Sequence, residues 1–264
     1  MRTIRTAATL IILLAASAVA VFAGDWVDTK HVVVYDGDLY SIETGGALYV
    51  TDLARGTWRQ IGKAEFGKTK FLFAGASSLY TIETDGSLYR VSPSNGSWSQ
   101  VGKAADWKRT MVGATIGDKL YTIETEGALY ETNLLNGSWR RIGTAEFLRT
   151  KFLYADSGRL YSIEQDGNFY QVSASNGSWQ RIGNSNDWLN TNRSTMFNGR
   201  LYSTEGGALY VTDPSSGSWR QIGKKEFGSA KFLFGAGNFL YSIEFSGNLY
   251  RISPSDGSWV QIGK

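Results

Sequence analysis

One short string returns six times along this chain at a nearly constant spacing. It reads Gly-Ser-Trp, or Gly-Thr-Trp in the first copy, and is followed by two residues and then by Ile-Gly or Val-Gly. Successive tryptophans lie 40, 41, 40, 40 and 40 residues apart, at Trp58, Trp98, Trp139, Trp179, Trp219 and Trp259. A period of this length is typical of one supersecondary unit that buries its apolar surface against its neighbours, so the sequence predicts a repeat architecture.

Two further strings keep the same phase. One is Leu-Tyr-Ser/Thr-Ile-Glu, which becomes Leu-Tyr-Ser-Thr-Glu in the fifth copy and ends at Glu43, Glu83, Glu124, Glu164, Glu205 and Glu244. The other is Gly-x-Leu/Phe-Tyr, which ends at Tyr49, Tyr89, Tyr130, Tyr170, Tyr210 and Tyr250. Every copy therefore has a glutamate and several aromatic residues at equivalent positions.

Each copy contains four short runs of β-forming residues separated by turn signals. In the second copy the runs are 70–73, 79–83, 87–91 and 97–101, and Asx-Gly pairs separate the later runs. Such pairs adopt the positive φ that tight hairpins need, so the four strands of a copy should form an antiparallel meander. Six four-stranded copies predict an all-β fold, a six-bladed β-propeller.

The repeats fill residues 24–264 as a single propeller without a linker or a second domain. The six blades are expected at approximately 25–64, 65–105, 106–145, 146–186, 187–225 and 226–264. The repeats leave no spare strand to share between the first and last blades. We therefore expect the ring to close by packing of the first blade on the sixth, and the protein to be a monomer.

Residues 1–23 differ from the repeats and have the pattern of a secretory signal peptide. Two arginines precede an apolar run over 7–20, and the segment ends at Ala23 with small residues where a signal peptidase cleaves. We predict a secreted or periplasmic protein with no membrane span after cleavage. The alternative is an uncleaved membrane anchor, although the apolar run is short for a span of about 20 residues.

Composition excludes several classes of function. The sequence contains no cysteine, so it has no disulfide scaffold, no Cys/His metal set and no thiol nucleophile. Its 27 basic and 24 acidic residues become 25 and 24 once Arg2 and Arg5 leave with the leader, which indicates no nucleic-acid partner. An enzyme needs residues with distinct roles that break the repeat, and the sole histidine, His31, lies in an apolar run. We expect no catalytic residue, no metal and no cofactor.

A second period of two copies lies inside the first. The three remaining tryptophans each follow an aspartate, in the pairs Asp25-Trp26, Asp106-Trp107 and Asp187-Trp188. The even copies have Glu65-Phe66, Glu146-Phe147 and Glu226-Phe227 at the same place. Those copies continue into Lys-Phe-Leu-Phe or Lys-Phe-Leu-Tyr runs that begin at Lys70, Lys151 and Lys231. The predicted propeller thus consists of three two-blade units with approximate three-fold symmetry.

The even copies resemble the repeats of tachylectins and tectonins, a family of β-propeller lectins. The resemblance rests on the run from Glu65 to Phe73, on the following Leu-Tyr-x-Ile strand and on the closing Trp-x-x-Ile-Gly, and it extends to all six copies. It implies a propeller that binds glycans at equivalent sites between blades. The chain departs from the family pattern by having Glu-Phe or Asp-Trp where Gly-Gly-Trp is usual.

Most of the aromatic residues are expected to be core. The six repeat tryptophans lie in the fourth run of each copy, and twelve of the 14 tyrosines lie in the second and third runs. Large flat side chains fill the space between twisted neighbouring sheets. The six glutamates should form a structural acid ring, with partners among Arg59, Arg140, Arg141, Arg181 and Arg220. A ring that faces a ligand or a cation is the alternative.

The candidate ligand-binding residues are the six acid-aromatic pairs in the links between blades, together with the three lysines that begin the even runs. An aromatic face can stack on a sugar while a carboxylate accepts hydrogen bonds from its hydroxyls. The alternative is that these aromatics only fill the cleft between adjacent blades. The sequence thus predicts a non-catalytic, lectin-like protein that binds a glycan or a cell-surface polysaccharide. A protein–protein interaction scaffold is the second interpretation, and a glycan-processing enzyme is the third.

Overall fold

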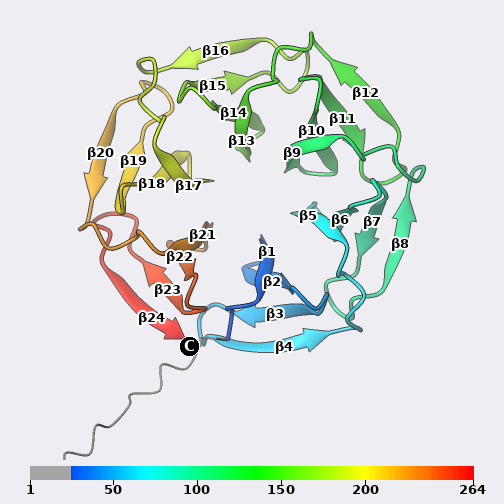
Figure 1. Ribbon diagram of the computed structural model, residues 1–264, viewed down its shortest axis with the longest axis horizontal. Coiled ribbons are helices and arrows are strands. Elements are labelled where there is room, and N and C mark those ends of the chain that lie inside the picture. Colours follow the sequence, from blue (N-terminus) through cyan, green and yellow to red (C-terminus); the bar gives the residue numbers. More distant parts are fainter. Residues whose placement is uncertain (1–24) are drawn as a thin grey trace, which may run out of the picture.

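Six four-stranded antiparallel sheets stand in a ring around a central axis and form a six-bladed β-propeller (Figure 1). The computed structural model describes residues 25–264, and this part of the chain contains no helix, hence none long and apolar enough to cross a membrane. The predicted fold class is confirmed. The expected signal peptide at 1–23 lies outside the described residues.

Each blade is a meander of four consecutive strands. The first blade contains β1 (Thr29–Tyr35), β2 (Asp38–Glu43), β3 (Leu48–Asp52) and β4 (Thr57–Ile61). The second contains β5 (Thr69–Ala74), β6 (Leu79–Glu83), β7 (Leu88–Val91) and β8 (Trp98–Val101). The third contains β9 (Thr110–Ile116), β10 (Lys119–Glu124), β11 (Leu129–Asn133) and β12 (Trp139–Ile142).

The second half of the ring repeats this order. The fourth blade contains β13 (Thr150–Asp156), β14 (Arg159–Glu164), β15 (Phe169–Val172) and β16 (Trp179–Ile182). The fifth contains β17 (Thr191–Phe197), β18 (Arg200–Glu205), β19 (Ala208–Thr212) and β20 (Trp219–Ile222). The sixth contains β21 (Ala230–Ala236), β22 (Phe239–Glu244), β23 (Leu249–Ile252) and β24 (Trp259–Gly263). In every blade the first strand lies nearest the axis and the fourth lies at the rim (Figure 1).

Successive side chains of a strand point to opposite faces of its blade. In the third blade, Leu120 and Trp139 lie on the face toward the second blade, where Leu120 joins a cluster with second-blade residues. Tyr121 and Arg140 lie on the other face, where Tyr121 joins a cluster with the fourth blade. We call these the preceding face and the following face of a blade.

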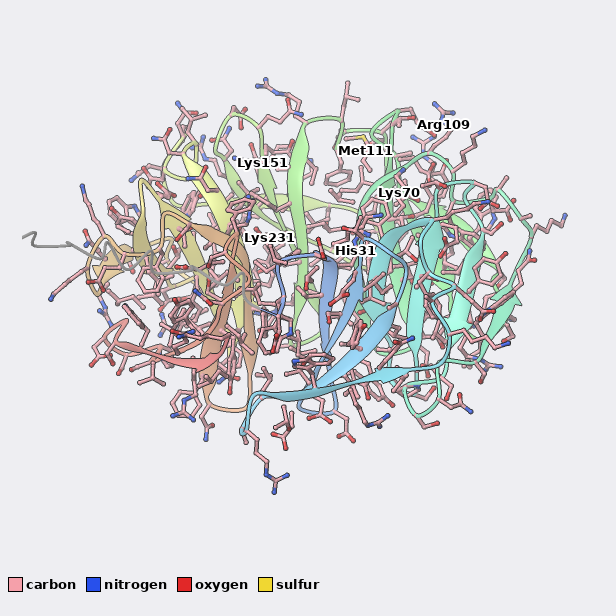
Figure 2. All side chains as sticks on the ribbon, turned by 60° about the horizontal axis from the view of Figure 1, so that its bottom comes forward. His31, Lys70, Arg109, Met111, Lys151 and Lys231 are labelled. Carbon is pink, nitrogen blue, oxygen red and sulfur yellow. The ribbon has the colours of Figure 1, made fainter. Side chains whose placement is uncertain are left out.

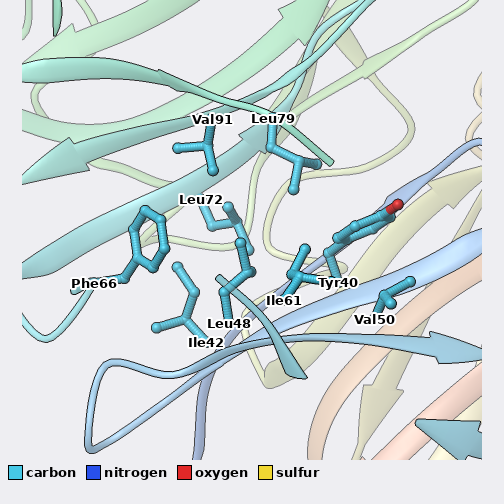
Figure 3. Packing of buried hydrophobic residues seen from close by; sticks show 9 residues of the cluster. All are labelled: Tyr40, Ile42, Leu48, Val50, Ile61, Phe66, Leu72, Leu79 and Val91. Carbon is cyan, nitrogen blue, oxygen red and sulfur yellow. The ribbon is translucent and has the colours of Figure 1, made fainter. Parts of the chain in front are cut away.

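Apolar residues from facing blades fill each junction. At the first junction, Ile42 and Leu48 of one blade belong to the same cluster as Phe66, Leu72 and Leu79 of the next (Figure 3). Six such clusters occur, one for each junction. Each fully buried side chain of this kind contributes about 1.5–3 kcal/mol, so the six layers between blades form the core of the fold.

The ring closes without strand exchange, as predicted. The first and sixth sheets each consist of four consecutive strands, β1–β4 and β21–β24. Trp26 packs with Phe234 in the cluster at the closing junction. The Trp26 amide donates a hydrogen bond of 3.2 Å to the Gly247 carbonyl, and the Trp107 amide donates one of 3.0 Å to Gly86 at an interior junction. Closure therefore uses the same backbone bond and the same kind of aromatic packing as an interior junction.

The two-copy period has a physical basis at the junctions. The indoles of Trp107 and Trp188 donate to the hydroxyls of Thr132 and Thr212, at 3.0 and 3.3 Å. The larger ring also needs space, because a Cβ added to Gly102 would lie 2.7 Å from the Trp107 ring. Even copies pair the smaller phenylalanine with an apolar residue at the threonine position: Val91, Val172 and Ile252. Tryptophan and phenylalanine junctions thus alternate around the ring.

Candidate functional site

The six tryptophans of the rim strands are exposed, which corrects the prediction that they belong to the core. Between 44% and 52% of each residue is accessible to solvent, against 2% for Trp107. The rim strand is the last strand of its sheet, so nothing pairs with its outer edge, and the first three residues of β12 are exposed. The second-strand tyrosines, such as Tyr80 and Tyr121, are buried as predicted.

Each exposed tryptophan is bonded to the acidic residue that opens its own repeat. In the third repeat, Trp139 Nε1 donates to Asp106 Oδ2 at 3.0 Å. Equivalent bonds of 2.8–3.3 Å join Trp58 to Asp25, Trp98 to Glu65, Trp179 to Glu146, Trp219 to Asp187 and Trp259 to Glu226. The acids of the predicted acid-aromatic pairs therefore hold the indoles of the rim strands.

A tyrosine of the third strand supports the same indole. The Tyr130 ring meets the Trp139 ring edge-on, with centroids 5.4 Å apart and an interplanar angle of 81°. All six repeats contain this pair, at centroid distances of 5.1–5.5 Å. Because edge-to-face contact is a favourable arrangement of aromatic rings, each indole is oriented by both the tyrosine and the acid.

The six glutamates of the predicted acid ring lie at the ends of the second strands, beside these tyrosines. Thr110 donates its hydroxyl proton to Glu124 at 3.2 Å, and Thr150 makes the same bond to Glu164 at 2.8 Å. Burial raises the pKa of both glutamates, since the charged form loses hydration. No ion pair joins any of the six to a lysine or arginine within residues 25–264. Threonines of the same blade, in place of the arginine partners that the sequence suggested, donate to four of the six: Glu83, Glu124, Glu164 and Glu205.

A hollow opens between the acid, the glutamate, the tyrosine and the tryptophan of a repeat. In the second repeat it has a volume of about 200 Å³, and its lining includes Glu65, Glu83, Tyr89 and Trp98. Hollows with the equivalent lining occur in the third, fifth and sixth repeats, with volumes of about 80, 60 and 40 Å³. Each hollow is lined by one repeat alone and lies on the preceding face of its blade. We call it the repeat pocket.

The aromatic members of the predicted pairs lie under the pocket and belong to the core. The three tryptophans are 2% exposed and the three phenylalanines are 3–6% exposed: Trp26, Trp107, Trp188, Phe66, Phe147 and Phe227. Trp107, for example, packs with Phe73 and Leu88 of the preceding blade. Such burial leaves no ring face for a sugar to stack on, so these residues fill the cleft between blades.

The predicted lysine donors lie away from the repeat pockets, on the innermost strands (Figure 2). Lys70 Nζ donates to the Thr110 carbonyl of the next blade at 2.5 Å, and Lys151 makes the same bond to the fifth blade at 2.6 Å. Lys231 Nζ reaches the Val27 carbonyl at 3.0 Å across the closing junction. These lysines tether neighbouring blades to one another.

Sequence reasoning found the acids and the glutamates of the pocket but assigned its tryptophan and tyrosine to the core. A signal for exposure was present in the fourth run. Trp58 is followed by Arg59 and Gln60, and Trp98 by two polar residues, so this run lacks the alternation of a strand covered on one face. The tyrosines carried no such signal, because the second and third runs both contain the same Leu-Tyr or Phe-Tyr pair near their start.

The pocket combines two carboxylates, a phenol and a half-exposed indole. Among residues 25–264, no group of three His, Asp or Glu side chains is placed to hold a metal ion. This lining suits recognition of a polar ligand that also has an apolar face.

No protein-family model and no curated protein matches this sequence. Solved structures share its architecture. YCF48 from Cyanidioschyzon merolae gives a TM-score of 0.59 at 15% identity, over 89% of this chain and 86% of that one. PorZ, a bacterial surface component of the type-IX secretion system of Porphyromonas gingivalis, gives 0.58 at 13% identity, over 89% of this chain and 32% of PorZ. The computationally designed Ika8 protein gives 0.55 at 13% identity, over 84% of this chain and 69% of that one. At these identities the likeness is one of fold alone, and the fold is the β-propeller.

Proposed function

We propose that this protein binds carbohydrate at its repeat pockets, without catalysis. The main support is the half-exposed tryptophan whose indole N–H is held by a carboxylate in all six repeats. An indole held in this way presents an apolar ring to one face of a sugar. The remaining lone pairs of the carboxylate accept hydrogen bonds from the sugar's hydroxyls. Since the ring is already oriented, little side-chain entropy is lost on binding.

The proposed function agrees with the resemblance to tachylectin and tectonin repeats, but it assigns the stacking role to a different residue. The ligand still sits between blades at equivalent positions, but it stacks on the rim tryptophan and not on the aromatic member of the acid-aromatic pair. Six weak sites on one ring favour a polymeric ligand, because simultaneous binding multiplies affinity through avidity. The proposed ligand is therefore a cell-surface polysaccharide, bound by a monomeric protein that the predicted leader exports.

The test is a screen of immobilised polysaccharides and arrayed glycans with the mature protein. We expect the triple variant Trp98→Ala, Trp139→Ala, Trp259→Ala to lose at least about tenfold in apparent affinity, because three of the repeat pockets described above lose their stacking ring in an avid contact. Leu135→Ala is the matched control, since Leu135 is 60% exposed and does not belong to the lining described for the repeat pocket. Undiminished binding by the triple variant would overturn the proposal.

A protein–protein interaction scaffold is the second candidate, and one observation favours it. Leu148 and Leu189, which directly follow Phe147 and Trp188, are 55% and 49% exposed. Exposed leucines in consecutive blade links are suited to apolar contact with another protein. Binding of an extracellular protein that is lost in Leu148→Ser plus Leu189→Ser, but kept in the triple tryptophan variant, would favour this function over carbohydrate binding.

A further inference from the structure

The following face of the third blade carries a self-contained cluster of donors around one carboxylate. Tyr121, Glu131 and Arg140 are cross-strand neighbours on β10, β11 and β12. The Glu131 carboxylate accepts from the Arg140 guanidinium at 3.2 and 3.3 Å and from the Tyr121 hydroxyl at 3.1 Å. Lys119 Nζ donates to it as well, at 3.1 Å. One carboxylate thus satisfies three donors and is only 13% exposed.

The fifth blade has equivalent donors but not the carboxylate. Tyr202, Val211 and Arg220 are the corresponding cross-strand neighbours on β18, β19 and β20, and Arg200 begins β18 as Lys119 begins β10. A valine therefore stands where the third blade has Glu131. Within residues 25–264, the Tyr202 hydroxyl has no hydrogen-bond partner, and the Arg220 guanidinium has a single long one, 3.5 Å to a backbone carbonyl of the sixth blade.

The acid nearest to these donors is already engaged. Asp213 holds the Arg200 guanidinium at 2.5 Å, and its other oxygen accepts from the backbone N–H of Ser215 at 2.9 Å. Asp213 thus has a partner on each oxygen, and its charge offsets that of Arg200. The first blade differs again, because Asp38 stands where the fifth blade has Arg200 and interacts with the charge of Arg59. The first blade thus has an acid at the position of Arg200, and the third has one at the position of Val211. Of the three odd blades, only the fifth has an acid at neither position.

These donors line a groove on the following face of the fifth blade, which the turn after β23 of the sixth blade borders. The groove has a volume of about 500 Å³, and its lining includes Arg200, Tyr202, Arg220, the ion-paired Asp213 and, from the turn after β23, Pro254. Small-molecule sites occupy about 300–1,000 Å³, so the space admits a sugar-sized ligand. The groove lies on the following face of the blade whose preceding face carries a repeat pocket, and Trp219 borders both.

We propose that this groove binds a carboxylate-bearing sugar, a uronate, with its carboxylate in the place that Glu131 occupies in the third blade. Arg220 donates two parallel hydrogen bonds, since a guanidinium matches the geometry of a carboxylate, and the Tyr202 hydroxyl donates a third. Arg200 is ion-paired with Asp213, so the positive charge offered to the ligand is that of Arg220. The carboxylate assignment stands on the groove alone, whereas the sugar part rests on the proposed function.

Calorimetric titration of the whole protein with D-glucuronate, D-glucose and acetate tests the assignment. We expect one glucuronate site per chain, at least about tenfold tighter than glucose, because only glucuronate supplies the missing acceptor. Val211→Glu places a carboxylate from the chain itself in the groove and should weaken glucuronate and acetate at least about tenfold. Val50→Glu makes the same change on the following face of the first blade and should leave both affinities unchanged.

Arg220→Gln is the second variant, and it keeps the test valid if Val211→Glu does not fold. Unchanged glucuronate affinity in Arg220→Gln would overturn the proposal, and so would tighter binding of D-glucose 6-sulfate than of glucuronate. Acetate binding that Val211→Glu weakens, without any response to glucuronate, would keep the carboxylate site and reject the uronate. If the rim tryptophan variants leave polysaccharide binding unchanged while Arg220→Gln abolishes glucuronate binding, the proposed function fails and this inference stands.

Discussion

The indole nitrogen of Trp139 donates a hydrogen bond of 3.0 Å to the carboxylate of Asp106, which lies 33 residues earlier in the same repeat. Asp106 belongs to the link that enters the blade, and Trp139 belongs to the strand at its rim. The bond therefore joins the beginning of a blade to its end, next to the pocket that both residues line. It also divides the tryptophans of this protein into two classes that mutation can separate.

The rim class should matter for binding and little for stability. We expect Trp98→Ala to lower the free energy of unfolding by about 1 kcal/mol or less, because half of the residue is already exposed. Its effect on polysaccharide binding should be larger than its effect on the melting temperature. Thermal unfolding and binding measured on the same preparation check this, and a large drop in melting temperature without a binding defect would contradict it.

The tryptophans buried at the junctions between blades should matter for stability more than for binding. Trp107→Ala removes a ring that is 2% exposed and should cost about 3–5 kcal/mol of unfolding free energy through the cavity it leaves. Trp26→Ala should cost a similar amount if the closing junction is as well packed as the interior ones. Denaturant unfolding of the two variants gives the comparison, and a much smaller cost for Trp26→Ala would show that the ring closes more loosely.

The pairing of tryptophan with threonine at odd junctions predicts a measurable coupling. Trp107→Phe leaves the Thr132 hydroxyl without its donor, and adding Thr132→Val recreates the apolar pair of the even junctions. The double variant should be more stable than the sum of the single effects by about 0.5–3 kcal/mol. Trp26 with Thr51 is the control cycle, because the Thr51 hydroxyl is without a partner within the described residues and should couple less.

The buried glutamates predict a pH dependence of known sign. Burial raises the folded-state pKa of Glu164, so its ionised form destabilises the fold. The stability contributed by this group therefore increases as the pH falls through the folded-state pKa to that of an unfolded glutamate, and it is lost as the pH rises through the folded-state pKa. Glu164→Gln keeps an acceptor for the Thr150 hydroxyl. We expect its melting temperature to exceed that of the wild type at about pH 7.5 and to equal it at about pH 4.5. Glu146→Gln, at the exposed acid of the same repeat, serves as the control for a general charge effect.

The lysine tethers can be compared with a natural substitution in the ring. Methionine stands at the position of Lys70 in the third blade, as Met111 (Figure 2). Lys70→Met should lower the free energy of unfolding by about 1 kcal/mol, because the Thr110 carbonyl loses a charged donor. Polysaccharide binding should not change, since Lys70 lies on an innermost strand away from the repeat pocket. A binding defect in this variant would place the ligand nearer the axis.

Repetition made most of the fold predictable from the sequence. The period near 40, the Asx-Gly pairs and the alternating β-type runs predicted six four-stranded blades, and the absence of a spare strand predicted closure without strand exchange. The two-copy period predicted the alternation of junctions, because tryptophan and phenylalanine need different partners in the layer between blades. Such features are local or periodic, so they can be read along the chain.

The sequence by itself determined the architecture, the number of blades and the acids that open each repeat. Only the tertiary structure decided which tryptophans are buried, because Trp107 and Trp139 are each followed by two basic residues along the chain. The difference arises from position in the blade: Trp107 lies between two sheets, whereas Trp139 lies on the rim strand, whose outer edge is unpaired. Likewise, only the tertiary structure places Val211 beside Arg220 where the third blade has Glu131 beside Arg140, because each pair lies on two neighbouring strands.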